Sequence, residues 1–319
     1  MKILLIKMSS LGDVIHTLPA LSDAQKIIPS IQFDWVVEPA FSEIPAWHPV
    51  VNKIIPVNLR YFKKHPIEAL KKKFIFDLYQ QINQTNYDLI IDAQGLLKSA
   101  VIAKLAKGVR CGYDKNSIKE KWASYFYDQK YTVSKELHAI SRIRELFSKI
   151  LNHDFEKNKL DYGINFNQTK QLEIHLPKKY IVFLHATTWP TKHYSEKNWE
   201  ILLKRLNNIP ILLPWGNFTE KLRAENFTKK FSNAILLPKL TIAEMAFVLK
   251  NACVVVAVDT GLGHLSAALL TPTISLYGPT DPKKVGTVGE NQVHLVAATQ
   301  TDQVNIDPEH ILEKIKNFI

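Results

Sequence analysis

The chain has 319 residues and a mass of 36.5 kDa, enough for two ordinary domains, and its 46% hydrophobic and 22% charged residues are typical of a globular protein. No apolar run approaches the roughly 20 residues that cross a bilayer, and the short apolar run after Met1 is broken by Lys7. We therefore expect a soluble chain with neither a membrane-spanning segment nor a secretory signal peptide.

The chain is basic, with 41 Lys and Arg against 30 Asp and Glu and a formal net charge of +11. Residues 1–160 hold 24 of the basic and 16 of the acidic side chains, so most of the excess lies in the first half. A positive surface suits a nucleic acid, an acidic membrane face, or a phosphorylated or carboxylated substrate. The two cysteines, Cys111 and Cys253, fit no metal-ligand spacing, which favours a reduced, cytosolic compartment.

The first half alternates predicted strands with predicted helices. Residues 2–7 form a short apolar run typical of a buried parallel strand, and Val14, Leu18 and Leu21 then recur at helical spacing. Further strands are predicted at 32–37 and 87–92, and a helix near 98–107. This alternation indicates a parallel sheet covered by helices on both faces.

The pattern weakens between residues 152 and 179, where Asn, Lys and Gln are frequent, and we place a domain boundary there, with domains at 1–165 and 166–319. Strands are then predicted at 180–185, 210–213, 234–237, 253–258 and 273–277, and helices at 195–207, 218–231, 241–250 and 261–269. Pro308 opens a last helix, which could also pack back on the first domain. The fold class is therefore α/β, with two doubly wound parallel-sheet domains and a cleft between them.

Three polar loops in the second half follow predicted strands, where ligands of open parallel sheets gather. They are Asp259-Thr-Gly-Leu-Gly-His264, His185-Ala-Thr-Thr188 with Lys192, and Trp215-Gly-Asn-Phe-Thr-Glu220. Glycines and a helix start suit a diphosphate, and a carboxylate such as Glu220 suits ribose hydroxyls. Each loop alone is equally typical of turn and cap chemistry. Because all three fall at one sheet edge, we favour a nucleotide site.

Several common motifs are absent from the sequence. It has no G-x-G-x-x-G and no G-x-x-x-x-G-K-[ST], which argues against a dehydrogenase and a P-loop NTPase. It also has no Asp-x-Asp, the carboxylate pair that often holds a divalent ion on a diphosphate. We therefore expect no metal and no cofactor, with Lys192 and backbone amides stabilising a departing diphosphate.

In the first half, Asp13 follows Ser9-Ser10-Leu11-Gly12 at the start of a predicted helix. An aspartate at that position is most often a helix cap. The alternative is a general base that faces the cleft, with the donor of the second domain opposite it.

Blocks of sequence in the same order resemble the lipopolysaccharide heptosyltransferases, glycosyltransferase family 9. They are Lys7-Met-Ser-Ser-Leu-Gly-Asp13, Asp92-Ala-Gln-Gly-Leu-Leu-Lys98, His185-Ala-Thr-Thr188 with Lys192-His193, Leu213-Pro-Trp-Gly216, Asp259-Thr-Gly-Leu-Gly-His264 and Tyr277-Gly-Pro-Thr-Asp-Pro282. The resemblance implies two Rossmann-like domains in the GT-B arrangement, the first binding the acceptor and the second the donor. It also implies inverting, metal-independent transfer of L-glycero-D-manno-heptose from ADP-heptose to Kdo of Kdo2-lipid A.

The resemblance also implies roles for single residues. Asp13 matches the catalytic base and Lys192 the group that stabilises the leaving diphosphate. The remaining donor contacts would be Thr187, Thr188, Glu220, Asp259, Thr260, Gly261, Leu262 and His264, and the acceptor contacts Ser10, Arg60, Lys64 and Lys98. A bilayer-anchored acceptor implies a peripheral enzyme on the anionic cytoplasmic face of the inner membrane.

Two other functions are compatible with the residues. A related heptosyltransferase could act on a heptose acceptor, because acceptor choice depends on few contacts. A nucleic-acid-binding protein could use the basic first half, but no RNP-like aromatic set or recognition-helix motif is present, and we expect no nucleic-acid partner.

Overall fold

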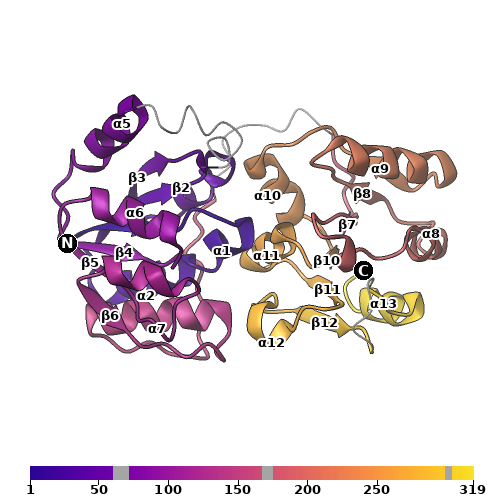
Figure 1. The fold of residues 1–319 in the computed structure, drawn as a ribbon. Helices are drawn as coiled ribbons and strands as arrows, with labels where there is room; N and C mark the ends of the chain where they lie inside the picture. Colours follow the sequence, from indigo (N-terminus) through magenta and orange to yellow (C-terminus); the bar gives the residue numbers. More distant parts are fainter. Residues whose placement is uncertain (60–71, 167–174, 299–303) are drawn as a thin grey trace. The chain divides into compact units, whose positions relative to one another are not determined.

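The computed structural model describes residues 1–59, 72–166, 175–298 and 304–319. The chain divides into two compact units, Met1–Phe166 and Asn167–Ile319, each with its own parallel sheet (Figure 1). This division lies next to the boundary predicted after residue 165. Among the described residues, none of the helices combines the length and the apolar character that crossing a bilayer requires.

The first unit contains a parallel sheet in the order β3-β2-β1-β4-β5-β6. This is the 3-2-1-4-5-6 order of doubly wound nucleotide-binding folds, in which the direction of winding reverses between the first and fourth strands. The strands are β1 (Lys2–Ile6), β2 (Gln32–Val37), β3 (Val51–Pro56), β4 (Leu89–Asp92), β5 (Val109–Tyr113) and β6 (Gln129–Tyr131). The helices are α1 (Leu11–Ile15), α2 (Leu18–Ile27), α5 (Lys72–Ile82), α6 (Leu97–Leu105) and α7 (Ala139–Leu151), with 3-10 turns η1 (Pro39–Phe41), η2 (Pro45–Trp47) and η3 (Lys121–Phe126).

The central strands of this unit are the ones that their sequence predicts. Residues 3–6 of β1 are fully buried, because a parallel sheet with helices on both faces leaves no strand face in water. The predictions at 32–37, 87–92 and 98–107 are confirmed by β2, β4 and α6. Strands β3, β5 and β6 and helices α5 and α7 were not predicted. The two edge strands, β3 and β6, are partly exposed and lack the apolar pattern of a central strand.

A buried ion pair joins α2 to α7 in the first unit. Arg144, 2% exposed, donates from Nε and Nη2 to the two carboxylate oxygens of Asp23 at 2.6 and 3.1 Å. The same guanidinium also donates to the carbonyl oxygens of Glu156 and Lys159, both at 3.0 Å. The pair is therefore fully hydrogen-bonded, which a buried charge requires.

The second unit repeats the same winding, with the sheet order β12-β11-β10-β7-β8-β9. Here the reversal lies between β7 and β10, the first and fourth strands of the unit. The strands are β7 (Ile181–Leu184), β8 (Ile211–Leu213), β9 (Ala234–Leu236), β10 (Val254–Val258), β11 (Thr273–Tyr277) and β12 (Gln292–Val296). The helices are η4 (Pro190–Lys192), α8 (Glu196–Arg205), α9 (Phe218–Lys230), α10 (Ile242–Lys250), α11 (Gly261–Ala268), α12 (Pro282–Val285) and α13 (Pro308–Ile315).

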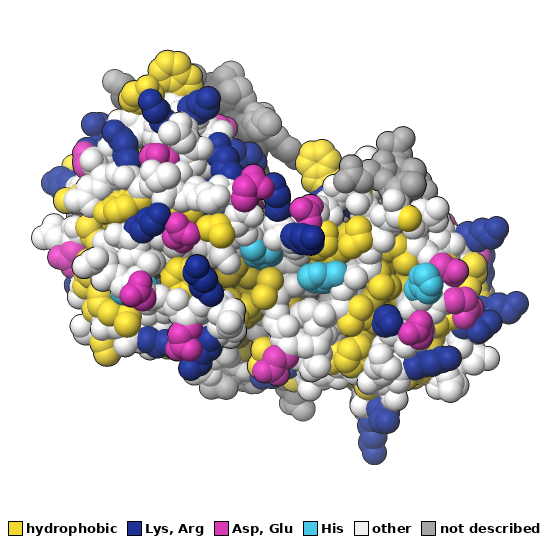
Figure 2. All heavy atoms as spheres, turned by 90° about the horizontal axis from the view of Figure 1, so that it is seen from below, with side chains coloured by type: hydrophobic (Ala, Val, Ile, Leu, Met, Phe, Trp, Pro, Cys, Tyr) yellow, Lys and Arg dark blue, Asp and Glu magenta, His cyan; other side chains and the backbone are white. Residues whose placement is uncertain are grey.

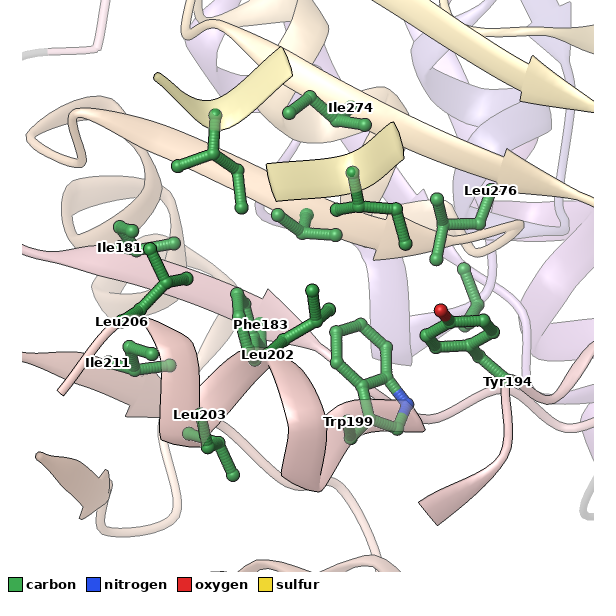
Figure 3. Packing of buried hydrophobic residues seen from close by; sticks show 14 of the residues in the cluster. Ile181, Phe183, Tyr194, Trp199, Leu202, Leu203, Leu206, Ile211, Ile274 and Leu276 are labelled. Carbon is green, nitrogen blue, oxygen red and sulfur yellow. The ribbon is translucent and has the colours of Figure 1, made fainter. Parts of the chain in front are cut away.

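All the strands and helices predicted for this half are present, whereas η4, α12 and β12 were not predicted. Figure 3 shows the core beneath α8, where Trp199 packs against Phe183 and Tyr194 with ring centroids 4.9 and 5.3 Å apart. Helix α13 adds Ile311, Leu312 and Ile315 to this same core. The buried face of α13 therefore belongs to the core of the second unit.

Candidate functional site

Each sheet places several of its predicted site residues at the point where the strand order reverses. In the first unit the loops after β1 and β4 carry residues 7–10 and 93–96, and in the second the loops after β7 and β10 carry residues 185–193 and 259–260. The carboxyl ends of parallel strands lie at one edge of a sheet, and this crevice is where doubly wound folds bind ligands.

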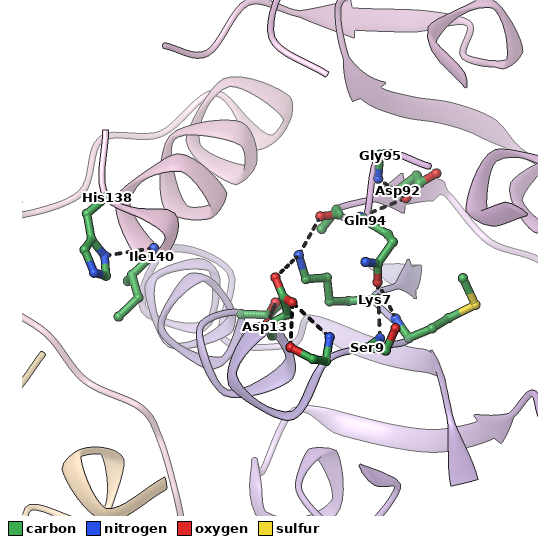
Figure 4. A network of polar contacts seen from close by, with 12 residues as sticks. Lys7, Ser9, Asp13, Asp92, Gln94, Gly95, His138 and Ile140 are labelled. Atoms are coloured by element: carbon green, nitrogen blue, oxygen red, sulfur yellow. Dashed lines mark hydrogen bonds and ion pairs between the residues drawn. The ribbon is translucent and has the colours of Figure 1, made fainter. Parts of the chain in front are cut away.

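Asp13 lies in α1, where the cap of the helix holds its carboxylate. Ser10, the N-cap residue, donates from its backbone N and from its Oγ to Oδ2 of Asp13, both at 2.9 Å. Lys7 Nζ lies 3.3 Å from Oδ1. The N-cap is therefore Ser10, and Asp13 is its reciprocal partner rather than the cap that its position suggested (Figure 4).

The surroundings of Asp13 keep it ionised. Burial raises the pKa of Asp13, but the Lys7 ammonium and the hydrogen bonds from Ser10 outweigh burial and lower the pKa to about 2. The Asp13 side chain is 43% exposed, whereas that of Lys7 is only 7% exposed. The Asp13 carboxylate is therefore held by a buried cation and remains partly exposed to solvent.

The end of β4 clamps the loop that carries this carboxylate. Gln94 Oε1 accepts hydrogen bonds from the backbone N of Met8 at 2.9 Å and of Ser9 at 3.2 Å. Lys7 Nζ also donates to the carbonyl oxygen of Ala93 at 3.1 Å. Figure 4 shows Gln94 reaching across to Ser9 from the neighbouring strand. The two strands at the reversal point are therefore tied to each other through side chains.

Asp92 in turn fixes the turn that carries Gln94. Its Oδ1 accepts from the backbone N of Gln94 and Gly95 at 2.9 and 3.1 Å, and its Oδ2 accepts from the Tyr127 hydroxyl at 2.7 Å. Burial raises the pKa of Asp92, and these hydrogen bonds oppose the rise. Gly95 has a φ of +69°, a left-handed conformation that favours glycine. Asp92, which is fully buried, is therefore a structural support and not an exposed acid.

The predicted acceptor contacts are only partly described. Ser10 lies beside Asp13, and because its hydroxyl donates to Asp13, it is left able to accept from a ligand. Lys98 is exposed in the first turn of α6, which follows the Gln94 turn. Arg60 and Lys64 lie outside the described residues.

In the second unit an ion pair bridges the reversal point. Lys192 Nζ lies 2.5 Å from Oδ2 of Asp259, and the two side chains are 25% and 9% exposed. Thr187 Oγ1 donates to the carbonyl oxygen of Asp259 at 3.3 Å. Thr188 is exposed on the same loop. The structure therefore brings Thr187, Lys192 and Asp259 together.

Helix α11 starts at the same point. Thr260 is its N-cap, and Gly261 and Leu262 form its first turn, so their amides point out of the helix start as a diphosphate cradle requires. His264 is only 8% exposed within the helix. Asp259, at the same point of the fold, has a side chain of similar burial at 9% exposed.

Glu220 is held by its own loop. Its Oε2 accepts from the backbone N of Gly216 and its Oε1 from Nδ2 of Asn217, both at 2.7 Å. Asn217 is the N-cap of α9 and accepts from the backbone N of Glu220 at 3.0 Å. A carboxylate has about four acceptor sites, so Glu220 can cap this turn and still accept two hydroxyls.

Arg223, one turn further along α9, was not predicted as a site residue. Its Nη1 donates to the carbonyl oxygen of His185 at 3.3 Å and to Nδ1 of His193 at 3.1 Å, and its Nε donates to Glu196 at 3.0 Å. Because a guanidinium can only donate, Nδ1 of His193 accepts and the ring carries its proton on Nε2. Burial and then Arg223 lower the pKa of His193. Arg223 thus holds both ends of the loop that carries Thr187 and Lys192.

Across the described ranges there is no group of three or more His, Cys, Asp or Glu side chains that could hold a metal ion. Lys7, Gln94 and Arg223 are the functional candidates that the motifs did not single out. Lys7 and Gln94 lie inside the blocks quoted for the family resemblance, and Arg223 lies three residues after Glu220, on the same helix face. Spacing could have indicated all three, but only coordinates show what they hold.

The comparisons with known proteins agree on one family. The model of "Glycosyltransferase family 9 (heptosyltransferase)" matches residues 75–316. The chain is 47% identical over 298 residues to lipopolysaccharide heptosyltransferase 1 of Pseudomonas aeruginosa, covering 92% of this chain and 83% of the relative. It is 43% identical to lipopolysaccharide heptosyltransferase 1 of Escherichia coli K12, covering 100% of both chains.

Solved structures give the same result. The structure described as E. coli heptosyltransferase WaaC with ADP has a TM-score of 0.92 and 41% identity, covering 100% of both chains. WaaC with ADP-2-deoxy-2-fluoro heptose has a TM-score of 0.87, 42% identity and 99% coverage of both chains. E. coli ADP-heptose lps heptosyltransferase II has a TM-score of 0.75 at 18% identity over 100% of this chain and 98% of that one, which shows the shared fold. The predicted fold class, two Rossmann-type domains of the GT-B kind, is confirmed.

Proposed function

The chain belongs to glycosyltransferase family 9, the heptosyltransferases, and we propose that it moves L-glycero-D-manno-heptose from ADP-heptose to Kdo of Kdo2-lipid A, with inversion and without a metal, in the synthesis of the lipopolysaccharide inner core. The observation that carries this proposal is an Asp13 carboxylate fixed by Lys7 and Ser10 at the strand reversal of the first unit. Relatives above 40% identity named lipopolysaccharide heptosyltransferase 1 support the pathway. The similar WaaC structures with ADP and with ADP-2-deoxy-2-fluoro heptose support the donor.

The second unit would bind ADP-heptose. Lys192, Thr187, Thr188 and the first amides of α11 (Thr260, Gly261 and Leu262) would hold the diphosphate, because they join a cation, hydroxyls and a helix start. Glu220 would accept the ribose hydroxyls, and Asp259 would lie near the heptose. His264, whose exposure of 8% is close to the 9% of the Asp259 side chain, stays a predicted donor contact.

In the transfer step an acceptor hydroxyl oxygen of Kdo forms a bond to the anomeric carbon of the heptose as the bond from that carbon to the ADP oxygen breaks. Asp13 takes the hydroxyl proton, and Lys192 with the α11 amides stabilises the negative charge on the departing ADP. A carboxylate with a pKa of about 2 is a weak base, so it accepts the proton only as the attacking oxygen becomes acidic, late in the step. The role of Asp13 then depends on its fixed position as much as on its basicity.

The first unit would bind the acceptor. Ser10 and Lys98, with Arg60 and Lys64, would contact its carboxylates and phosphates, which agrees with the excess of basic residues in the first 160. Because lipid A is anchored in a bilayer, we place the enzyme peripherally on the anionic cytoplasmic face of the inner membrane.

A heptose acceptor is the second candidate, and the products separate it from the first. Purified enzyme with ADP-heptose should release ADP and add one heptose in mass to Kdo2-lipid A, and addition only to an already heptosylated acceptor would favour the second candidate. The same assay after EDTA treatment should give an unchanged rate, and loss of the rate would overturn metal independence.

The nucleic-acid-binding alternative finds no support in the family. On the face drawn in Figure 2, Lys and Arg side chains are scattered among acidic ones and do not form one basic stripe. A nucleic-acid site of that kind needs basic side chains gathered on one surface.

A further inference from the structure

Two large aromatic rings project into solvent from η3 in the first unit. Trp122 and Tyr125 are 71% and 69% exposed, and their ring centroids lie 5.6 Å apart. Residues three apart eclipse each other on a 3-10 helix, so both rings lie on one face. Ala123 and Ser124 between them are buried and anchor the turn. The exposed rings are therefore held by a fixed backbone.

This turn is joined to the start of α6. The carboxylate of Glu120 accepts from the backbone N of Leu97 at 2.7 Å, and the backbone N of Glu120 donates to the Gly95 carbonyl oxygen at 3.3 Å. Leu97 and Val101, four residues apart on one helix face, are 41% and 50% exposed. We call the exposed side chains on these two joined elements, Leu97, Val101, Trp122 and Tyr125, the aromatic surface.

The segment that carries the aromatic surface is rich in basic residues. Residues 97–125 contain seven Lys and Arg but only two acidic residues, Asp114 and Glu120. Both carboxylates accept hydrogen bonds from backbone amides. Six exposed lysines form no ion pair within the part of the chain that the structure describes: Lys98, Lys104, Lys107, Lys115, Lys119 and Lys121. Apolar rings beside unpaired cations fit a partner with an apolar interior and an anionic face.

We propose that the aromatic surface docks the protein on an anionic phospholipid bilayer. Trp and Tyr concentrate at the membrane–water boundary, because their rings are apolar and their N–H and O–H remain hydrated there. The surrounding lysines bind anionic headgroups while their stems lie along the apolar boundary. An acidic protein partner would explain the lysines but does not require rings that project so far from the fold.

The position of the aromatic surface links docking to catalysis, and this step rests on the proposed function. Leu97 precedes Lys98, a proposed acceptor contact, and the same α6 start follows the Gln94 turn that clamps the Asp13 loop. A bilayer bound at Trp122 and Tyr125 would therefore lie beside the acceptor half of the site. Docking would present a lipid-anchored sugar to Asp13 without extracting the lipid from its bilayer.

Vesicle co-sedimentation tests the docking directly. The full chain should sediment with phosphatidylcholine vesicles that contain 30% phosphatidylglycerol, at physiological salt, and much less with phosphatidylcholine alone. The Trp122→Ser/Tyr125→Ser double variant should lower the partition coefficient at least 10-fold. Lys119→Gln/Lys121→Gln should lower it several-fold and flatten its salt dependence. Phe218→Ser, at a side chain 70% exposed in the second unit, is the matched control and should bind like wild type.

A second exposed apolar group provides the decisive contrast. On α5, Ile75 and Phe76 are 47% and 57% exposed. If Ile75→Ser/Phe76→Ser abolishes vesicle binding while Trp122→Ser/Tyr125→Ser does not, the proposal is overturned. Equal binding of wild type to neutral and anionic vesicles, or binding only when an acidic protein is added, would also overturn it.

An activity measurement separates docking from the proposed transfer. With a Kdo acceptor that lacks acyl chains, Trp122→Ser/Tyr125→Ser should keep the wild-type kcat/KM, and with vesicle-embedded Kdo2-lipid A it should lose at least 10-fold. A wild-type enzyme that binds vesicles but transfers no heptose would contradict the proposed function and leave docking in place. Equal losses on both acceptors would contradict the docking role.

Discussion

Lys192 and Asp259 form an ion pair that joins the loop after β7 to the end of β10. It lies where the strand order of the second sheet reverses, and it holds the Lys192 ammonium near the start of α11. A lysine that is fixed in place before substrate binds loses little entropy when a diphosphate arrives. The first unit has a similar ion pair, between Lys7 and Asp13, at the reversal point of its own sheet.

Removing Lys192 should slow transfer. We expect Lys192→Ala to lower kcat about 10²–10³-fold, because the negative charge on ADP develops in the transition state without its cation. The measurement is ADP release in the presence of acceptor. Lys230→Ala, which removes a 55%-exposed lysine paired with Glu200 in the same unit, should match wild type. Wild-type turnover in Lys192→Ala would remove the leaving-group role.

Removing Lys7 should move the acid limb of the pH profile. The pKa of Asp13 is lowered from 3.8 to about 2 in the folded protein, so its ionised form is kept from neutral pH down to about pH 2. Without Lys7, the largest opposing charge to burial is lost and the pKa of Asp13 rises. In a profile of kcat/KM from pH 4 to 8, wild type should show no loss due to Asp13, and Lys7→Met should decline at higher pH than wild type.

The same shift affects stability. Because the folded-state pKa of Asp13 lies below its unfolded value, the ion pair stabilises the fold above about pH 4 and is lost as the pH falls through 2. Lys53→Met removes a lysine that donates hydrogen bonds to Gln81 and Gln84. It is the control for the kcat/KM profile and for the free energy of unfolding measured against pH. Identical acid limbs in Lys7→Met and wild type would show that Lys7 does not set the charge of Asp13.

Gln94→Ala should lower kcat and leave donor affinity unchanged. The change removes the acceptor of the Met8 and Ser9 amides, whose loss costs about 1–3 kcal/mol and frees the loop that carries Asp13. We expect roughly a 10-fold or larger fall in kcat, with ADP affinity by titration calorimetry equal to wild type. Gln80→Ala on exposed α5 is the control. A weaker affinity for ADP with normal kcat would contradict this role.

Arg223→Ala, unlike Gln94→Ala, should weaken donor binding. Without Arg223, both ends of the loop that carries Thr187 and Lys192 lose their common donor, so the KM for ADP-heptose should rise about 10-fold or more while the acceptor KM is unchanged. Arg223→Lys should restore part of the loss. Arg205→Ala, at a surface arginine 59% exposed and paired with Glu309, is the control. An unchanged donor KM would exclude a positioning role.

Breaking the Asp23–Arg144 pair should destabilise the first unit. Asp23→Ala leaves a buried guanidinium without its carboxylate, which typically costs about 3–5 kcal/mol in the free energy of unfolding. Glu309→Ala breaks an exposed pair and should cost less than about 1 kcal/mol. Urea denaturation compares the two variants. Equal stabilities would contradict the structural role of the buried pair.

The sequence predicted the central strands of both sheets, because buried parallel strands are short apolar runs that end in polar loops. It did not predict β3 and β6, since edge strands carry polar residues such as Lys53 and Gln129. The family resemblance located Asp13 and Lys192 through local blocks. It did not show that Gln94 bonds Ser9, since these residues are 85 positions apart and only the pairing of β1 with β4 brings them together.

The local sequence pattern also did not predict the hydrogen bonds and charges that surround a site residue. Position alone predicts that Asp13 caps its helix, whereas Ser10 is the cap and the Lys7 ammonium helps to lower the pKa of Asp13. A sequence motif does not show which face of a helix a side chain lies on or which neighbours it contacts.

The most direct test of the central claim is the kcat of Asp13→Asn for heptosyl transfer to the Kdo acceptor, measured beside its affinity for ADP. Asparagine keeps the shape of the side chain and an oxygen for Ser10, and it removes the proton acceptor. We predict a loss of about 10²–10⁴-fold in kcat with unchanged ADP affinity. Turnover equal to wild type would contradict it.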